Sequence, residues 1–360
     1  MEQRKEKHLA ICTDPSLYRV EGAGADFDGV RFLHTALPEI AESEIDTTTT
    51  FLGSRVALPF FVSCMTGGSE GGFRANRLLA EAAEALRIPV GVGSIRVLLD
   101  NPGLFEHFHV KPLAPSVPVL ANIGAVQVRD RDTAALLDVV ARLEAQALVV
   151  HLNPGQELFQ PEGDRDFRGL SDAIARLCER SAVPVIVKET GFGILPGLVR
   201  ELLDAGAAYV DIAGAGGTNW ISVESYRLPE EERGPAAEFA DWGIPTAVLL
   251  AALEPDAEPG AGRILASGGI RSGMDAARAV AMGAALAGFA LPVIRAVVAD
   301  GVAGVTRYFR ALERTLRTVM PLTGSRTIAE LQRGVTWREP VFQARVDAFL
   351  GAQGTGLRSS

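Results

Sequence analysis

Eight short apolar segments recur along this chain, and each is followed by polar or glycine-rich residues. Apolar runs of four or five residues are typical of strands that are buried on both faces. Segments with helical periodicity lie between most of them, for example residues 75–86, 132–145, 170–181, 196–206 and 273–283. The predicted strands are residues 60–64, 89–92, 117–121, 147–151, 185–188, 208–212, 263–266 and 285–289.

Eight strands that alternate with helices predict a parallel sheet, and eight is the number that closes a (β/α)₈ barrel. A chain of 360 residues is long enough for one such barrel. A doubly wound open sheet is the alternative, but it usually has a G-x-G-x-x-G turn after its first strand, which we do not find here. We expect an arm with barrel-closing elements in residues 1–55, the barrel in 56–345 with a long loop insertion after its sixth strand, and a disordered tail in 346–360.

The composition of the chain excludes several classes of protein. The chain has 35 Lys and Arg against 44 Asp and Glu, a net charge of −9, which argues against non-specific binding to nucleic acid or anionic lipid. We find neither a signal peptide nor a run of roughly 18 to 20 apolar residues that could span a membrane, so we expect a cytoplasmic protein. Cys12, Cys64 and Cys178 are far apart, which predicts free thiols rather than a disulfide or a zinc site.

Polar side chains crowd the end of the fourth predicted strand. The sequence ALVVHLNPGQE places His151, Asn153, Gln156 and Glu157 directly after an apolar run. In a parallel barrel, active sites gather at the carboxyl ends of the strands. We therefore interpret this segment as part of an active-site mouth, although an ordinary polar loop has a similar composition.

The segments after the seventh and eighth strands, ASGGIRSG and AGFALP, are typical of a barrel phosphate site. Gly268 and Gly269 would offer backbone N–H groups, the following helix its N-terminus, and Arg271 a charged donor. Lys188 ends a strand of sequence VIVK, where an unpaired ammonium group is costly unless an anion or an electron-rich ring satisfies it. A single FMN fits these features best, with its phosphate at strands seven and eight and its ring across the mouth.

In this order, the motifs RKEKH, MTGG, GSIR, HLNPGQE, PEGDR, VIVKE, GAGGTNW, DWGIPTA, SGGIRSG and GFALP resemble those of the type 2, FMN-dependent isopentenyl-diphosphate isomerases. The resemblance covers most of the chain and implies an FMN-binding (β/α)₈ barrel. It also implies interconversion of isopentenyl and dimethylallyl diphosphates in isoprenoid biosynthesis, by reduced FMN acting as acid and base. The family's other requirements would be Mg²⁺ and NAD(P)H as the flavin reductant.

The resemblance also implies residue roles. Glu157 would hold Mg²⁺, and Gln156, Lys188 and His151 would serve catalysis. The family usually has Gln where this chain has Ile95, which puts the substrate contacts of that loop, but not the fold, in question. The substrate would contact Arg4, Lys5, His8, Ser94, Arg96, His151, Asn153 and Gln156. FMN would contact Met65, Thr66, Gly67, Ser94, Asn122, Lys188, Thr218, Gly268, Gly269, Arg271, Ala290 and Leu291.

Three other functions remain open at this point. A 2-hydroxy-acid oxidase would have a similar phosphate site but needs a His base after the seventh strand, and SGGIRSG has none. An FMN reductase of the dihydroorotate dehydrogenase type is a further alternative, and the third is a flavin-free barrel that binds a sugar phosphate. Partners other than the small diphosphate substrate would be copies of the chain, since the resemblance implies a homotetramer or homo-octamer.

Overall fold

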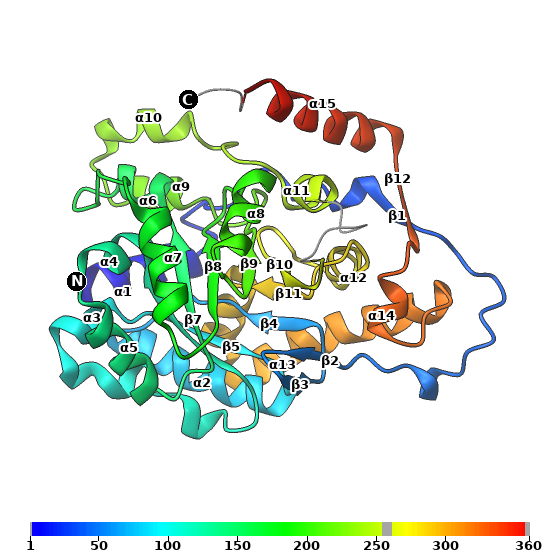
Figure 1. Cartoon of the computed structure of the whole chain (residues 1–360), viewed down its shortest axis with the longest axis horizontal. Helices are drawn as coiled ribbons and strands as arrows, with labels where there is room; N and C mark the ends of the chain where they lie inside the picture. The colour runs from blue at the N-terminus through cyan, green and yellow to red at the C-terminus, as the bar shows by residue number, and fades with distance from the viewer. Residues whose placement is uncertain (1, 254–260, 357–360) are drawn as a thin grey trace.

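The computed structural model describes residues 2–253 and 261–356, and its centre is a closed barrel of eight parallel strands (Figure 1). The last barrel strand pairs with the first, Ala287 beside Phe60, so the open-sheet alternative is excluded. All eight predicted strands are present, with bounds that differ by a few residues. They are β4 (Phe60–Val62), β5 (Val90–Ser94), β6 (Val119–Gly124), β7 (Ala147–Leu152), β8 (Val185–Glu189), β9 (Tyr209–Asp211), β10 (Ile264–Ala266) and β11 (Leu286–Phe289).

Helices surround the barrel (Figure 1). Their buried faces are rich in small residues. In α2 (Glu70–Leu86), Ala75, Ala82 and Ala83 are buried and allow close packing on the strands. The Oγ of Ser69 accepts a hydrogen bond from the N–H of Gly72, which fixes where this helix begins. The other main outer helices are α5 (Thr133–Arg142), α7 (Leu170–Arg180), α8 (Pro196–Asp204), α11 (Thr246–Leu253), α12 (Gly273–Ala281) and α13 (Leu291–Leu322).

Shorter helices occupy the connections on the carboxyl side of the strands. Three of them, α6 (Pro154–Phe159), α9 (Trp220–Ser225) and α10 (Gly234–Ala237), lie in the segments after β7 and β9. The connection after the sixth barrel strand therefore contains helical structure. The remaining short helices are α3 (Arg96–Asp100), α4 (Ala125–Asp130) and α14 (Ile328–Leu331).

A hairpin closes the amino-terminal end of the barrel. It consists of β2 (Thr49–Phe51) and β3 (Ser54–Val56), paired antiparallel. Phe51 is fully buried and packs with Leu120, Ile186 and Tyr209, which lie near the beginnings of their strands. The carboxyl end of the barrel is consequently the end that remains open for a ligand.

A strand from the first part of the chain pairs with one from the last part, away from the barrel sheet. Strand β1 (Val30–Phe32) pairs antiparallel with β12 (Thr336–Arg338), and α15 (Pro340–Gly356) follows. The expectation of a disordered tail from residue 346 was therefore wrong as far as residue 356, because the apolar side chains of Phe342 and Val346 are buried and tie the helix down. Residues 357–360 lie outside the described part, and the divisions at residues 55 and 345 stay predictions.

No helix within residues 2–253 and 261–356 combines the length and the apolar character that crossing a membrane requires.

We predict that Phe51→Ala lowers the free energy of unfolding by about 3–5 kcal/mol, because it leaves a cavity in the closed end of the barrel. Urea unfolding followed by circular dichroism measures the change. Val341→Ala is the control, since this side chain is 75% exposed. Equal stability of the two variants would contradict a packing role for the hairpin.

Candidate active site

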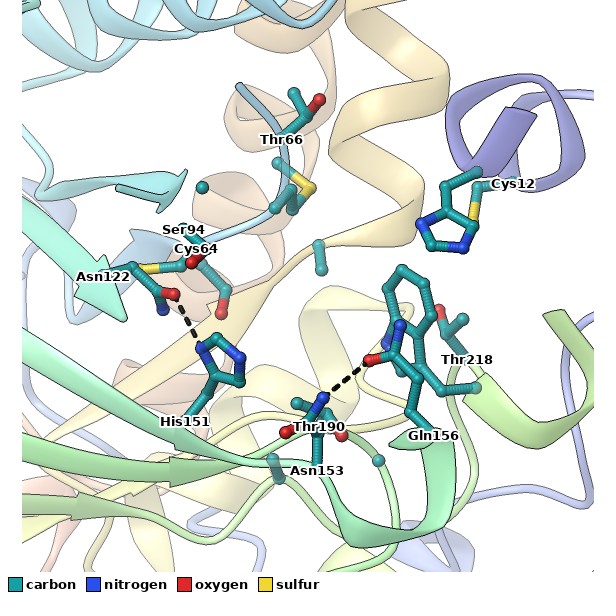
Figure 2. Close-up of a pocket in the computed structure, with 18 of the residues that line it drawn as sticks. Cys12, Cys64, Thr66, Ser94, Asn122, His151, Asn153, Gln156, Thr190 and Thr218 are labelled. Carbon is teal, nitrogen blue, oxygen red and sulfur yellow. Dashed lines mark hydrogen bonds between the residues drawn. The ribbon is translucent and has the colours of Figure 1, made fainter. Parts of the chain in front are cut away.

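One cavity at the carboxyl ends of the barrel strands brings all the predicted site residues together. It encloses about 1610 Å³ of space between atoms, including solvent at its mouth. Figure 2 shows His151 with Asn122 on one wall and Asn153 with Gln156 on another. The predicted residues that line it are Arg4, Lys5, His8, Met65, Thr66, Gly67, Ser94, Arg96, Asn122, His151, Asn153, Gln156, Glu157, Lys188, Thr218, Gly268, Gly269, Arg271, Ala290 and Leu291.

Backbone N–H groups gather where the chain leaves β10. Gly268 and Gly269 have φ angles of 94° and 73°, in the left-handed region that favours glycine. A Cβ on Gly268 would lie 2.0 Å from the carbonyl oxygen of Gly214, so only glycine allows the two loops to approach this closely. Within the described residues neither glycine N–H has a hydrogen-bond partner. These free donors suit an anion such as a phosphate.

The helix N-terminus at this end of the cavity differs from the one we expected. The first turn of α12 is closed by its own capping box, in which Ser272 accepts from the N–H of Asp275, and Asp275 accepts from the N–H of Ser272. The helix that faces the cavity is α13, whose first residue, Leu291, lines it together with Ala290. Pro292 has no N–H and the N–H of Val293 donates to the carbonyl oxygen of Ala290 at 3.0 Å, so the N–H of Leu291 is the donor of this turn that an anion could use, at the positive end of the helix dipole.

Lys188 presents its ammonium group to the cavity. The side chain is buried, and Nζ donates to the carbonyl oxygen of Glu189 at 2.6 Å. The carboxylate of Glu189 is turned elsewhere, where it accepts hydrogen bonds from the N–H groups of residues 191–193. An ammonium group has three donors, so Lys188 keeps capacity for a ligand.

His151 is a neutral imidazole on the wall formed by β6 and β7. Its Nδ1 donates to Oδ1 of Asn122 at 2.8 Å, which leaves the lone pair on Nε2 (Figure 2). Burial, helped by the charges of Lys188 and Arg96, lowers the pKa of His151 to about 3. At neutral pH this side chain can therefore accept a hydrogen bond but carries no charge.

Asn153, Gln156 and Glu157 form one hydrogen-bonded group at the start of α6. The Nδ2 of Asn153 donates to Oε1 of Gln156 at 3.1 Å and to Oε1 of Glu157 at 2.9 Å. The other carboxylate oxygen of Glu157 accepts from the N–H of Asp164 at 2.9 Å. Both oxygens of Glu157 are thus held in place at the edge of the cavity.

Glu224 is a functional-site candidate that the sequence did not reveal. Its side chain is completely buried on α9, where Gln156 Nε2 donates to Oε1 at 2.8 Å and His8 Nε2 lies 2.9 Å from the same oxygen. Burial alone would raise the pKa of Glu224, but contacts with His8, Gln156 and Arg227 lower it. The only hint in the sequence was its place in the insertion after the sixth barrel strand.

The amino-terminal arm is a helix, α1 (Glu2–Thr13), and it covers one side of the cavity with basic side chains. The Nζ of Lys5 is buried without a hydrogen-bond partner in the described part of the chain and lies 5.3 Å from the centre of the Phe108 ring. Burial lowers the pKa of Lys5 to about 8, and the charges of Arg4 and Arg96 add to the shift. Arg4, Lys5 and Arg96 therefore place three positive charges close together, and the ammonium group of Lys5 has no partner. This arrangement predicts that an anion binds between them.

Ile95 does not reach the cavity. Its side chain is fully buried in the hydrophobic core, while its neighbours Ser94 and Arg96 line the cavity. The side-chain direction follows from the turn, in which the N–H of Ile95 donates to the carbonyl oxygen of Asn122 at 2.8 Å. The departure from the family pattern therefore changes core packing and not the cavity wall.

Two of the three free cysteines also line the cavity. Burial raises the pKa of Cys64 to about 11 and that of Cys12 to about 12, so both thiols stay protonated at neutral pH. Within residues 2–253 and 261–356, no three His, Cys, Asp or Glu side chains are grouped closely enough to hold a metal ion. A metal at Glu157 would need oxygen ligands from the substrate and water.

Solved structures of FMN enzymes share this fold. A flavocytochrome b2 with sulfite bound superposes with a TM-score of 0.68 at 18% identity, covering 94% of this chain and 84% of that chain. A mandelate oxidase variant superposes with a TM-score of 0.61 at 19% identity, covering 93% and 98%. At this level of identity the likeness shows the fold alone.

Sequence relatives place the chain more narrowly. The model of the FMN-dependent dehydrogenase family matches residues 19–98 and 126–338. An isopentenyl-diphosphate delta-isomerase of Pseudescherichia vulneris is 44% identical over 342 residues, 92% of this chain and 95% of the relative. An isopentenyl-diphosphate delta-isomerase of Borrelia garinii subsp. bavariensis is 38% identical over 347 residues, 96% of both chains. The chain therefore belongs to the FMN-dependent, type 2 family of isopentenyl-diphosphate delta-isomerases.

Proposed function

We propose that this protein interconverts isopentenyl diphosphate and dimethylallyl diphosphate, a step of isoprenoid biosynthesis, with FMN and Mg²⁺ bound in the cavity. The observation that carries the proposal is the buried, unpaired ammonium group of Lys5, because it marks a second anion site in addition to the glycine-rich one. A barrel that binds only a flavin has no need of that second site. One cavity with two anion sites fits a phosphorylated cofactor beside a diphosphate substrate.

The diphosphate would bind to the residues of α1. Arg4 and Lys5 would supply charge, and Nε2 of His8, which lies 2.9 Å from Oε1 of Glu224, is buried without a hydrogen bond in the described part of the chain. Arg96 and Ser94 approach from the loop after β5 on the same side. Since charge-assisted hydrogen bonds to phosphate oxygens are strong, these residues would fix the polar end of the substrate.

Mg²⁺ would bind between Glu157 and the substrate. The ion prefers oxygen ligands and usually keeps several waters, so a single carboxylate plus diphosphate oxygens satisfies it. Asn153 and the N–H of Asp164 hold the two oxygens of Glu157, and this would orient the carboxylate toward the ion.

FMN fits the opposite side of the cavity. Gly268, Gly269, Arg271, Ala290 and Leu291 would hold its phosphate. Bound in its reduced form, FMN supplies the group that gives and takes a proton during the movement of the double bond. The loops after β4, β5, β6, β8 and β9 would hold its ring through Met65, Thr66, Gly67, Ser94, Asn122, Lys188 and Thr218.

The side chains of the cavity would orient the flavin and the substrate, and they would not themselves transfer the proton. Lys188 would stabilise negative charge on the reduced ring, and neutral His151 accepts a hydrogen bond without adding a second cation. Gln156, held by Asn153 and Glu224, would sit beside the hydrocarbon end of the substrate. The isomerisation has no net redox change, so NAD(P)H would be needed only to keep the flavin reduced.

A redox-neutral assay tests the function directly. We expect the protein with reduced FMN and Mg²⁺ to convert radiolabelled isopentenyl diphosphate into an acid-labile allylic product without stoichiometric consumption of NAD(P)H. Oxidation of a 2-hydroxy acid or of dihydroorotate in place of this conversion would refute the proposal.

We further propose a cytoplasmic homotetramer or homo-octamer, as the family resemblance implies.

Glu157→Gln should abolish Mg²⁺-dependent turnover while FMN remains bound, because the neutral amide is a poor ligand for a hard cation. Turnover against Mg²⁺ concentration and the visible flavin spectrum measure the two effects. Glu201→Gln, on the exposed side of α8, is the matched control. Equal activity of the two variants would remove Glu157 from the metal site.

The substrate KM should depend on pH through Lys5. Its ammonium charge is present below its pKa of about 8 and is lost above it. We expect the KM to rise roughly tenfold between pH 7 and pH 9. Lys5→Arg should flatten this rise, because a guanidinium group stays charged over this pH range. Arg4→Ala and Lys5→Ala, which remove a positive charge, should each raise the KM at pH 7. The same pH profile in Lys5→Arg and the unaltered protein would exclude Lys5 as the titrating group.

Ile95→Gln should lower the free energy of unfolding by about 1–3 kcal/mol, because an amide would enter the core without an evident partner. The substrate KM should not change, since Ile95 does not line the cavity. Urea unfolding and steady-state kinetics separate the two effects. A changed KM with unchanged stability would mean that position 95 contacts the substrate after all.

A further inference from the structure

Glu21 lies between two arginines at the glycine-rich end of the cavity. Its Oε1 accepts from Nε of Arg271 at 2.8 Å and lies 2.7 Å from Nη2 of the same side chain, and its Oε2 accepts from Nη1 of Arg295 at 2.9 Å. Burial alone would raise the pKa of Glu21, but the two guanidinium groups hold it below its usual value. The carboxylate is therefore charged at neutral pH.

The contacts of Arg271 leave one edge of its guanidinium group available. Arginine has five N–H donors in a fixed fork. The N–H of Nε and one N–H of Nη2 face Glu21, and one N–H of Nη1 donates to the carbonyl oxygen of Ile270 at 3.0 Å. One donor on each terminal nitrogen remains, and this pair matches the bidentate geometry that arginine uses with phosphate.

The segment that carries Glu21 is hydrogen-bonded to the loop after β9, residues 217–219. The N–H of Gly22 donates to the carbonyl oxygen of Gly217 at 3.4 Å, and the N–H of Asn219 donates to that of Val20 at 2.8 Å. Glu21 is therefore paired with Thr218, which lines the cavity. Because its backbone is held on both sides, Glu21 can set the position of the longer and more flexible Arg271.

We infer that Glu21 is a positioning residue, which holds the guanidinium group of Arg271 at the angle needed to bind the cofactor phosphate. The inference rests on the proposed FMN phosphate site at Gly268, Gly269 and Arg271. Glu21 does not touch the phosphate itself, and its negative charge alone would repel it. Its contribution comes from the geometry it imposes on Arg271, while Arg295 offsets part of its charge.

Binding of two flavins to the full-length apoprotein tests this role, because riboflavin lacks the phosphate of FMN. We expect Glu21→Gln to weaken FMN binding by roughly three- to tenfold, since a neutral amide holds a guanidinium group less firmly than a carboxylate does. Riboflavin binding should stay the same. Quenching of flavin fluorescence on titration with protein gives both dissociation constants.

Glu339→Gln is the matched control, because Glu339 forms a similar ion pair with Arg31, 2.6 Å between Nε and Oε1, away from the cavity. This variant should bind both flavins as the unaltered protein does. If Glu21→Gln weakens FMN and riboflavin equally, its role is general folding and the inference is overturned. Unchanged or tighter FMN binding in Glu21→Gln also overturns it.

Arg271→Met separates the inference from the function on which it rests. If Arg271 binds the phosphate, this variant should lose more than tenfold in FMN affinity with riboflavin binding unchanged. Loss in Arg271→Met without loss in Glu21→Gln would refute the positioning role alone. No change of the FMN-to-riboflavin ratio in Arg271→Met would refute the phosphate site itself.

Discussion

The pairing of β11 with β4 is the constraint on which the site depends. Once the sheet is closed, eight strands end around a single opening, and residues far apart in sequence, such as Arg271 and Glu21 at a separation of 250 positions, become neighbours. The hairpin with Phe51 fills the opposite end, so a ligand has only one end of the barrel to enter. The closed ladder also keeps the strand ends rigid, which suits a site that must hold two ligands at fixed separation.

The net charge of the chain does not reveal how charged side chains are distributed around the cavity. The chain is acidic overall, yet one side of the cavity carries Arg4, Lys5 and Arg96 together, and the unpaired Nζ of Lys5 is buried among them. Such an arrangement is costly for the protein alone and becomes favourable when an anion arrives. At the other end, free backbone N–H groups and the start of α13 offer partial rather than full charges. The two ends therefore favour anions by different means, and an extended ligand pair can be oriented by them.

The barrel could be predicted because each strand is a continuous apolar run, and the proposed roles of the site residues were implied by the family resemblance of the motifs rather than by their place after those runs. Glu224 and Glu21 escaped prediction because each lies in a segment without strand or helix periodicity, and their partners are distant in sequence. Helix α15 was missed because its glycines hid an apolar face that Phe342 and Val346 bury. The direction of Ile95 could not be known either, since it depends on a turn in which adjacent side chains point to opposite sides.

The docking of α1 has a consequence for how the protein is made. The helix that carries Arg4, Lys5 and His8 is synthesised before the barrel strands, but some of its contacts are with residues synthesised much later. The carbonyl oxygen of Cys12, near the end of α1, accepts a hydrogen bond from Arg295, and Nε2 of His8 lies 2.9 Å from Oε1 of Glu224. A nascent chain cannot complete these contacts until most of the barrel has emerged. The mouth of the barrel is thus completed by a helix that is synthesised before the barrel itself, and a chain released early would have no complete site.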